Sequence, residues 1–150
     1  MTHLKQGDKA PAFSVKDQDG KTVSLADFAG SKLVIYFYPK DSTPGCTTQA
    51  CNLRDNYDAL LKSGYKVLGV SADSEKSHLK FIDKHNLPFP LLADTEKTML
   101  KAYGVFGPKK FMGRTYDGIH RTTFVIDENG LITEVITKVD TKNHTAQIMS

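Results

Sequence analysis

The sequence predicts an α/β fold with a central mixed sheet flanked by helices and a β-hairpin extension at the N-terminus. Two apolar runs, Leu33–Tyr38 and Tyr65–Ser71, enclose a stretch with helical periodicity. A strand, a helix and a second strand in this order are typical of a right-handed crossover with parallel pairing. Two later runs, Thr122–Asp127 and Leu131–Ile136, are joined by Glu-Asn-Gly130, which favours an antiparallel hairpin.

Short elements are predicted before the central sheet. The segments Ala12–Val15 and Thr22–Leu25 should form a hairpin that turns at Asp17–Gly20, and a short helical turn should follow at Leu25–Phe28. The run Leu33–Tyr38 carries no charge and consists of β-branched, aromatic and leucine residues. This composition is typical of a strand that is buried on both faces.

A helix is predicted to begin at Pro44. Pro39 ends the preceding strand, Thr43 is a good N-cap, and proline suits the first helical position because its missing N–H would have no partner there. Gly64 is a plausible C-terminal stop. The apolar residues of this segment recur at helical spacing and should face the core: Ala50, Leu53, Tyr57, Leu60 and Leu61.

The second half of the chain alternates helices and strands less regularly. Helices are predicted at Ser74–His85 and Thr95–Tyr103, and no strand is predicted between them. A long irregular stretch should then lead to the Thr122–Asp127 strand, and a last, short helix is expected at His144–Met149.

Length and composition bound the class of protein. The 150 residues, 39% of them hydrophobic, suit one domain that spans residues 1–150. A net charge of +3 is too small to indicate nucleic-acid binding, and the cluster of Lys109, Lys110 and Arg114 is better explained as a solvated loop than as a phosphate site. No apolar run is long enough for a membrane span or a secretion signal, which favours the cytoplasm.

Cys46 is the strongest candidate for a chemically active group. It falls in the first turn of the helix predicted at Pro44, where unpaired N–H groups and the helix dipole favour a thiolate over a neutral thiol. The thiolate is the nucleophilic form of cysteine. A small buried hydrophobe is the alternative, but the cap, the proline and the second cysteine all favour a reactive thiol.

Cys51 is the only other cysteine. In a continuous helix, residues five apart lie about 7.5 Å apart along the axis and roughly 140° around it. This exceeds the reach of a disulfide, so bonding Cys46 to Cys51 would require the first helical turns to unwind. Cys51 should share a face with Arg54 and Asp58 and lie nearer to solvent, and an inert surface thiol is the alternative.

Hydrogen-bond donors around Cys46 would stabilise negative charge there. The Thr43 hydroxyl is the nearest candidate, although helix capping explains it equally well. Gly45 leaves room beside the sulfur. Arg121, before the Thr122–Asp127 strand, is the best-placed distant cation, with Arg54 and Arg114 as competitors. The five histidines show no metal-ligand spacing, so no metal site is predicted.

Pro39, Thr43 and Cys46 form the pattern P-x-x-x-T-x-x-C, which resembles the active-site motif of the peroxiredoxins. The longer strings from Tyr38 to Cys51 and from Gly118 to Asp127 resemble the bacterioferritin comigratory protein or peroxiredoxin Q branch. The similarity covers nearly the whole chain. It implies a thioredoxin fold with an N-terminal hairpin, and thiol-dependent reduction of hydrogen peroxide and organic hydroperoxides by a monomer without a cofactor.

The same resemblance implies a role for each matching residue. Cys46 corresponds to the peroxidatic cysteine and Cys51 to the resolving cysteine, which would form an intramolecular disulfide with it. Thr43 and Arg121 would hold the peroxide and activate the thiolate, and Pro39 would shield the sulfur. Thioredoxin or a similar dithiol protein would reduce the disulfide. Gln49 stands where relatives often carry glutamate.

Two other classes of function remain open. A thioredoxin-like disulfide reductase would also use paired cysteines, but its usual C-x-x-C spacing is absent. A non-enzymatic redox-sensing domain would need a partner surface or metal ligands, for which the sequence gives no sign. A disulfide reductase would act on protein disulfides and ignore peroxide.

Overall fold

The computed structural model describes residues 2–150. Met1, the first residue of the predicted 1–150 domain, lies outside the described residues. The helices and strands follow one another in the order β1 (Ser14–Lys16), β2 (Thr22–Ser24), a 3₁₀ turn (Leu25–Phe28), β3 (Lys32–Phe37), α1 (Pro44–Asp55), α2 (Tyr57–Lys62), β4 (Tyr65–Ser71), α3 (Glu75–His85), β5 (Leu91–Ala93), α4 (Thr98–Ala102), β6 (Phe106–Phe111), β7 (Arg114–Ile119), β8 (Thr122–Ile126), β9 (Ile132–Ile136) and α5 (His144–Met149).

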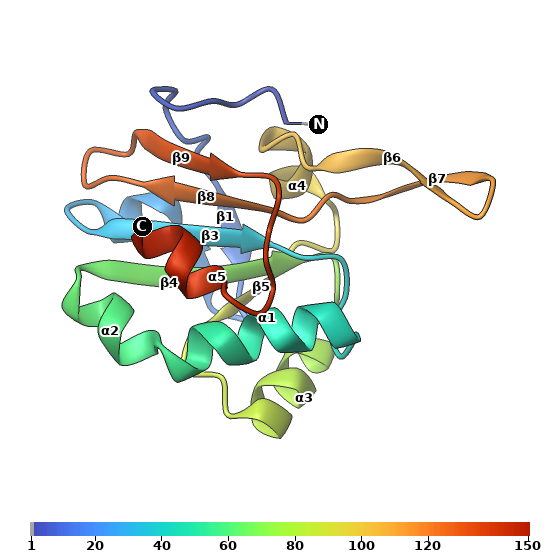
Figure 1. The fold of residues 1–150 in the computed structure, drawn as a ribbon, viewed down its shortest axis with the longest axis horizontal. Coiled ribbons are helices and arrows are strands. Elements are labelled where there is room, and N and C mark those ends of the chain that lie inside the picture. Colours follow the sequence, from blue (N-terminus) through green and yellow to red (C-terminus); the bar gives the residue numbers. More distant parts are fainter. Residues whose placement is uncertain (1) are drawn as a thin grey trace.

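The central sheet has five strands in the order β5-β4-β3-β8-β9. Strand β3 pairs in parallel with β4 on one side and antiparallel with β8 on the other (Figure 1). The predicted α/β class, the mixed sheet and the N-terminal hairpin of β1 and β2 are therefore confirmed. The register pairs Phe37 at the end of β3 with Thr122 at the start of β8, so the residues just beyond both positions meet at one end of the sheet.

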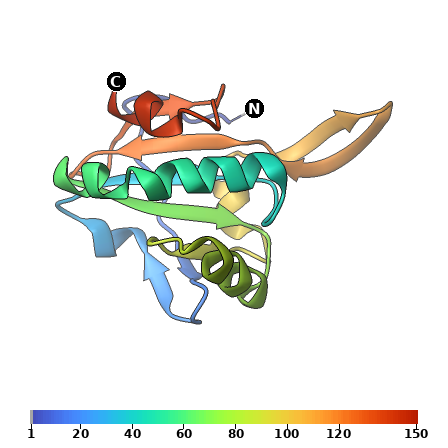
Figure 2. The same cartoon turned by 60° about the horizontal axis from the view of Figure 1, so that its bottom comes forward.

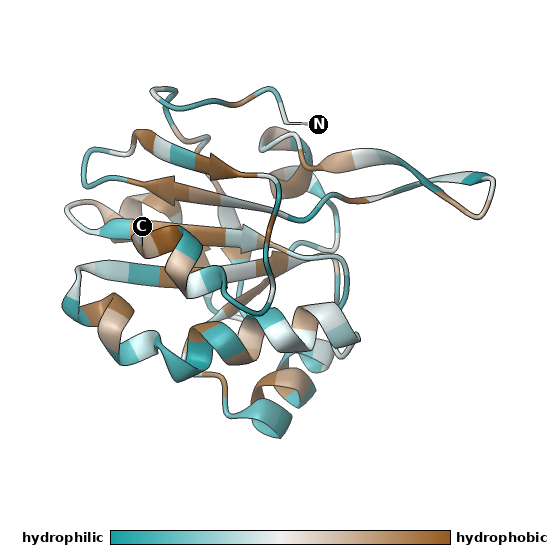
Figure 3. Ribbon diagram, in the orientation of Figure 1, coloured by the Kyte–Doolittle hydropathy of each residue, from teal (hydrophilic) through white to brown (hydrophobic). Residues whose placement is uncertain are grey.

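Strand β3 is buried on both faces, as its composition predicts. Leu33, Ile35 and Phe37 belong to one core cluster, together with residues of α4 and the N-terminal segment. Val34 and Tyr36 belong to the other cluster, with residues of α1, α2, α3 and α5. Figure 2 shows α1 lying across this second face. The central strands are mostly apolar, whereas the helices mix hydrophilic and hydrophobic residues along their length (Figure 3).

Close contact across the sheet explains a glycine in β4. A Cβ atom on Gly69 would lie 2.6 Å from Leu91 Cδ2 and 2.8 Å from the Tyr36 hydroxyl oxygen. Such distances are far below van der Waals contact, so no side chain fits between the neighbouring strands here.

The segment after β3 differs in part from the prediction. The helix does begin at Pro44, but Asn56 interrupts it, and a separate helix, α2, runs to Lys62. Leu61 was expected to face the core and is 38% exposed, because the break changes the direction of the inward face. Leu53 and Leu60 are buried as predicted.

The prediction of an irregular stretch before β8 is wrong. Strands β6 and β7 form a hairpin here that projects from the rest of the chain as an arm (Figure 1). Met112 and Gly113 form its two-residue turn and have φ angles of 51° and 78°, as a type I′ turn requires. The strand pattern is obscured by Pro108 and the lysines that follow it.

Smaller corrections concern two elements near the sheet edge. Strand β5 has only three residues, too few for a recognisable pattern, and was not predicted. Helix α4 begins at Thr98 instead of Thr95, because Lys97 adopts a left-handed conformation with φ of 66°. The final helix matches the predicted His144–Met149. Within residues 2–150, no helix combines the length and the apolar character needed to cross a bilayer.

Candidate active site

Cys46 lies in the first turn of α1 and is 1% exposed. It packs in the core cluster on the α1 face of the sheet, beside residues such as Tyr38 and Ala50. Its thiol is free, as is that of Cys51. The site thus combines a helix N-terminus with a nearly dry environment, in which nearby hydrogen-bond donors act strongly.

Arg121 supplies the cation at this thiol. Its Nη2 donates a hydrogen bond to Cys46 Sγ at 3.2 Å, and its Nη1 donates to Gln49 Oε1 at 2.5 Å. Arg121 directly precedes β8, whose first residue pairs with the end of β3, and this register carries the side chain to the start of α1. Arg121, the distant cation expected from the sequence, therefore lies beside Cys46 at the start of α1.

The competing arginines lie elsewhere. Arg54 Nε pairs with Asp55 at 3.0 Å, and its Nη1 donates to the backbone carbonyl of His85 at 2.7 Å. Arg114 is exposed in β7 on the projecting hairpin. The space beside Gly45 is taken by Arg121, whose Nη2 would lie 3.3 Å from a Cβ atom at that position.

Gln49 is a site residue whose role the sequence left open. It is fully buried one turn after Cys46, and its carbonyl oxygen accepts from Arg121. A neutral amide holds the guanidinium in place without a carboxylate's charge beside it. The Gln49 Nε2 and the Tyr36 hydroxyl are buried without a hydrogen-bond partner among the described residues.

Thr43 and Pro39 border the site on the loop between β3 and α1. Thr43 occupies the N-cap position of α1 but makes no side-chain cap bond. Its hydroxyl instead donates to the Lys40 carbonyl at 2.8 Å, which folds the loop back on itself. Pro39 is half-buried directly after the buried Tyr38.

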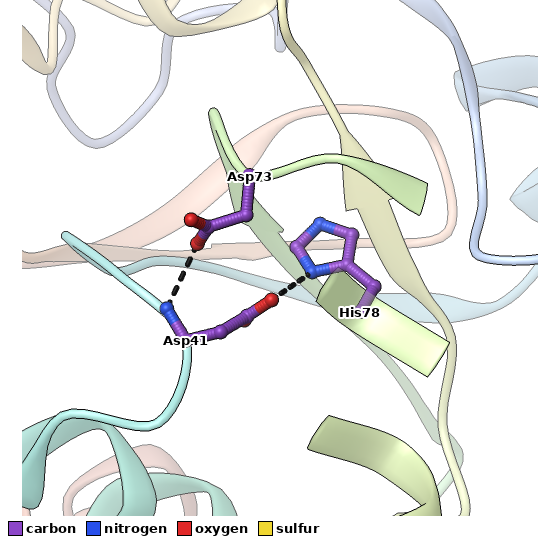
Figure 4. Close-up of side chains that lie close together, drawn as sticks. All are labelled: Asp41, Asp73 and His78. Atoms are coloured by element: carbon purple, nitrogen blue, oxygen red, sulfur yellow. Dashed lines mark hydrogen bonds and ion pairs between the residues drawn. The ribbon is translucent and has the colours of Figure 1, made fainter. Parts of the chain in front are cut away.

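Asp41 anchors this loop to the sheet and to α3 (Figure 4). Its Oδ2 lies 2.7 Å from His78 Nδ1, its Oδ1 accepts from the Tyr38 hydroxyl at 2.6 Å, and its Oδ2 also accepts from the Ser77 hydroxyl at 2.8 Å. The backbone N–H of Asp41 donates to Asp73 at 2.8 Å. The sequence gives no sign of this network because Asp41 lies more than thirty positions from Asp73, Ser77 and His78.

The donor atoms of Asp41, Asp73 and His78 lie within 4.8 Å of one another, a spacing compatible with a metal ion. Hydrogen bonds within the protein already engage them. The second nitrogen of His78 lies 2.9 Å from the Leu92 carbonyl, and the Ser71 hydroxyl donates to Asp73 at 2.7 Å. These atoms form a buried loop anchor whose polar groups are satisfied by the chain itself.

Cys51 is half-buried on α1, as expected from its face, and its nearest side-chain partner was not predicted. Its Sγ lies 3.9 Å from Nδ1 of His85, the last residue of α3. Burial and the nearby cations Lys84 and Arg54 lower the pKa of His85 below its ordinary value. A signal for this contact is absent from the sequence, since 34 positions separate the two residues.

A cavity of about 740 Å³ lies elsewhere in the molecule, between β1, the start of α3 and α4. None of the predicted site residues lines it. The buried Cys46 thiol is therefore separate from this cavity.

Comparison with known proteins gives the family. The AhpC/TSA family model matches residues 6–135. The chain is 51% identical to peroxiredoxin Bcp of Escherichia coli over 144 residues, which cover 96% of this chain and 92% of that protein. It also resembles the solved structure of a Xylella fastidiosa PrxQ mutant, with a TM-score of 0.92 and 31% identity. The match covers 99% of this chain and 95% of that one.

A second similar structure is that of the Xanthomonas campestris bacterioferritin comigratory protein, which has alkyl peroxide reduction activity. It matches with a TM-score of 0.88 and 34% identity, covering 99% of this chain and 95% of that one. These proteins share the thioredoxin-like peroxiredoxin fold. Since the family model covers most of the chain and half of the residues are shared with a peroxiredoxin, this chain belongs to the AhpC/TSA family and is a peroxiredoxin, a thiol-dependent peroxidase.

Proposed function

We propose that this peroxidase reduces hydrogen peroxide and alkyl hydroperoxides in a cycle that uses Cys46 and Cys51 in turn. The observation that carries the proposal is the 3.2 Å hydrogen bond from Arg121 to Cys46 Sγ. A buried thiol whose partner is a guanidinium, at the start of a helix, is poised to react as a thiolate. The alkyl peroxide activity of the Xanthomonas relative supports the wider substrate class.

In the first step, the Cys46 thiolate attacks one oxygen of the hydroperoxide. An S–O bond forms, the O–O bond breaks, and the electron pair leaves on the other oxygen, which takes up a proton to give water or an alcohol. Arg121 and the backbone N–H groups of the first helical turn stabilise that charge. The Thr43 hydroxyl joins them when it exchanges its bond to the Lys40 carbonyl for one to the peroxide. Cys46 becomes a sulfenic acid, and Pro39 limits access of solvent to it.

In the second step, Cys51 condenses with the sulfenic acid to give a disulfide and water. The first turn of α1 must unwind for this, because the helix holds the two positions too far apart. A dithiol protein such as thioredoxin then reduces the disulfide. In this proposal the protein is a single domain that acts as a monomer in the cytoplasm. The cycle uses neither a metal nor an organic cofactor.

The test is intact mass after rapid mixing of reduced protein with one equivalent of hydrogen peroxide. The parent should lose two hydrogens, Cys51→Ser should gain one oxygen, and Cys46→Ser should remain unchanged. Slow oxidation of all three proteins to similar extents would contradict the cycle. Reduction of insulin disulfides by the parent, without a response to peroxide, would instead favour a disulfide reductase.

A further inference from the structure

The surroundings of Cys51 differ from those of an inert surface thiol. His85 Nδ1 lies 3.9 Å from Cys51 Sγ, which is within range of a weak S–H···N hydrogen bond. The imidazole is itself packed edge-on against Phe81, with ring centroids 5.3 Å apart. This packing restricts the ring and directs Nδ1 toward the sulfur.

The charges around His85 favour its neutral, proton-accepting form. Burial lowers its pKa, and so do the cations Lys84 on α3 and Arg54 on α1. Asp55 lies 3.0 Å from Nε of Arg54, the same side chain whose charge lowers the pKa of His85. At neutral pH the ring therefore holds one proton, and with the proton on Nε2 the Nδ1 lone pair faces the thiol.

The part of α1 that carries Cys51 is tied down on two sides. Arg54, one turn further along, donates to the His85 carbonyl at 2.7 Å, which fixes this turn against the end of α3. On the other side, the Asn52 side chain donates to the Lys142 carbonyl at 2.8 Å and accepts from the Thr145 N–H at 2.8 Å.

The first turn of α1 has fewer such attachments. Thr48 donates back to Pro44 within the helix at 2.9 Å. The side-chain bonds that leave this turn are those of Cys46 and Gln49 with Arg121. When the helix opens, the Cys46 end is therefore the part that moves, and Cys51 stays beside His85.

We propose that His85 is the catalytic base of the resolving step, which removes the proton of the Cys51 thiol. This rests on the proposed two-cysteine cycle. His85 Nδ1 takes the proton, the Cys51 thiolate attacks the sulfur of the Cys46 sulfenic acid, the S–S bond forms and the S–O bond breaks. The departing hydroxide takes the proton back from the imidazolium and leaves as water, so His85 is regenerated.

The first test needs no peroxide. In a Cys46→Ser background, Cys51 is the remaining thiol, and its alkylation by iodoacetamide reports its thiolate form. Adding His85→Asn should slow alkylation at pH 7 by at least about tenfold, and millimolar imidazole should restore part of the rate. Asp83→Asn, an exposed change on the same turn of α3, is the matched control and should have no effect.

The pH profile separates a base from a purely structural residue. With His85 present, alkylation should fall on acidification as the imidazole becomes protonated, and this inflection should be absent in His85→Asn. Equal rates and identical profiles with and without His85 would overturn the proposal. A His85→Gln variant that folds and behaves like His85→Asn guards against an effect of lost packing.

The second test uses the full cycle. In His85→Asn, peroxide should form the Cys46 sulfenic acid at the parent rate, while disulfide formation slows by the same factor as alkylation. If Cys46 never forms a sulfenic acid in the parent, the proposed cycle fails, but the alkylation result still decides whether His85 acts on Cys51.

Discussion

The reactivity of Cys46 depends on a residue that lies 75 positions further along the chain. Arg121 contacts the sulfur and Gln49 at once, and only a planar, forked cation can make both contacts. Chemistry alone could not separate Arg121 from Arg54 and Arg114, and the family resemblance indicated the choice. The structure supplies the reason, which is the register of β8 against β3.

Loss of the guanidinium should slow the attack on peroxide. Arg121→Ala is expected to lower the second-order rate of Cys46 oxidation by about 10²–10³, the usual effect of removing one charge-stabilising donor. Arg121→Lys keeps the charge but cannot make both bonds, so its rate should fall between those of the parent and Arg121→Ala. Stopped-flow detection of sulfenic acid measures the rate. A lysine variant as slow as the alanine variant would show that geometry alone matters.

Helix α1 combines a well-defined start with a later break. The sequence predicted the start at Pro44 from proline and threonine, because helix termini obey local rules. It did not predict the break at Asn56, because the packing of α2 against the sheet decides where the helix turns. The disulfide formation that we propose requires the first turn of α1, which begins at Pro44, to unwind.

A change at Pro44 should affect resolution more than peroxide attack. Pro44→Gly removes the fixed φ angle of the first helical residue and destabilises the folded first turn by about 0.4–1 kcal/mol. Disulfide formation after a peroxide pulse should become about two- to fivefold faster, because unwinding costs less. Pro88→Gly, in the exposed connection after α3, is the control. Equal changes in both steps would argue against unwinding as the gate.

Helix α5 is attached to the sheet through His144. The ring is buried, with Nε2 lying 2.8 Å from the Thr123 hydroxyl and Nδ1 lying 2.8 Å from Gln147 Oε1. Burial is the main cause that lowers the pKa of His144 from its ordinary value of 6.5. The folded protein therefore favours the neutral ring, whereas the unfolded chain protonates it more readily.

The stability of the protein should consequently fall on acidification. Above pH 6.5 both states hold His144 neutral. Below that pH the unfolded state gains the proton first, and the free energy of unfolding should drop by at most about 1.4 kcal/mol per pH unit until the folded state also protonates. Urea unfolding at pH 7.5 and 5.5 measures the drop. His144→Asn should show a smaller difference between the two pH values, and an unchanged difference would contradict the assignment.

At the scale of the whole molecule, buried polar groups hold the active-site loop to distant elements. Both ring nitrogens of His78 face acceptors, the Asp41 carboxylate and the Leu92 carbonyl. This arrangement joins the loop after β3 to α3 and to β5. In contrast, the projecting hairpin of β6 and β7 contributes little to the core, and Met112 at its tip is 88% exposed.

Breaking this anchor should cost more stability than loss of a single hydrogen bond. Asp41→Asn replaces one of the two oxygens that face Tyr38, Ser77 and His78, and each buried polar group left without a partner costs about 1–3 kcal/mol. Ser77→Ala, which removes one donor to the same carboxylate, should cost about 1 kcal/mol. Urea midpoints with unchanged m-values provide the comparison. Equal effects of both variants would show that the contacts of Asp41 with Tyr38 and His78 add nothing to the anchor.

The sequence by itself determined the fold class, the buried strands and the placement of Cys46 at a helix start. These features depend on local patterns of apolar residues, proline and turn residues, which act over a few positions. Only the tertiary structure decided which arginine reaches the thiol, that Asp41 binds His78, and that His85 faces Cys51. Each of these contacts joins residues that are more than thirty positions apart, and strand register and helix packing, which depend on the whole chain, bring them together.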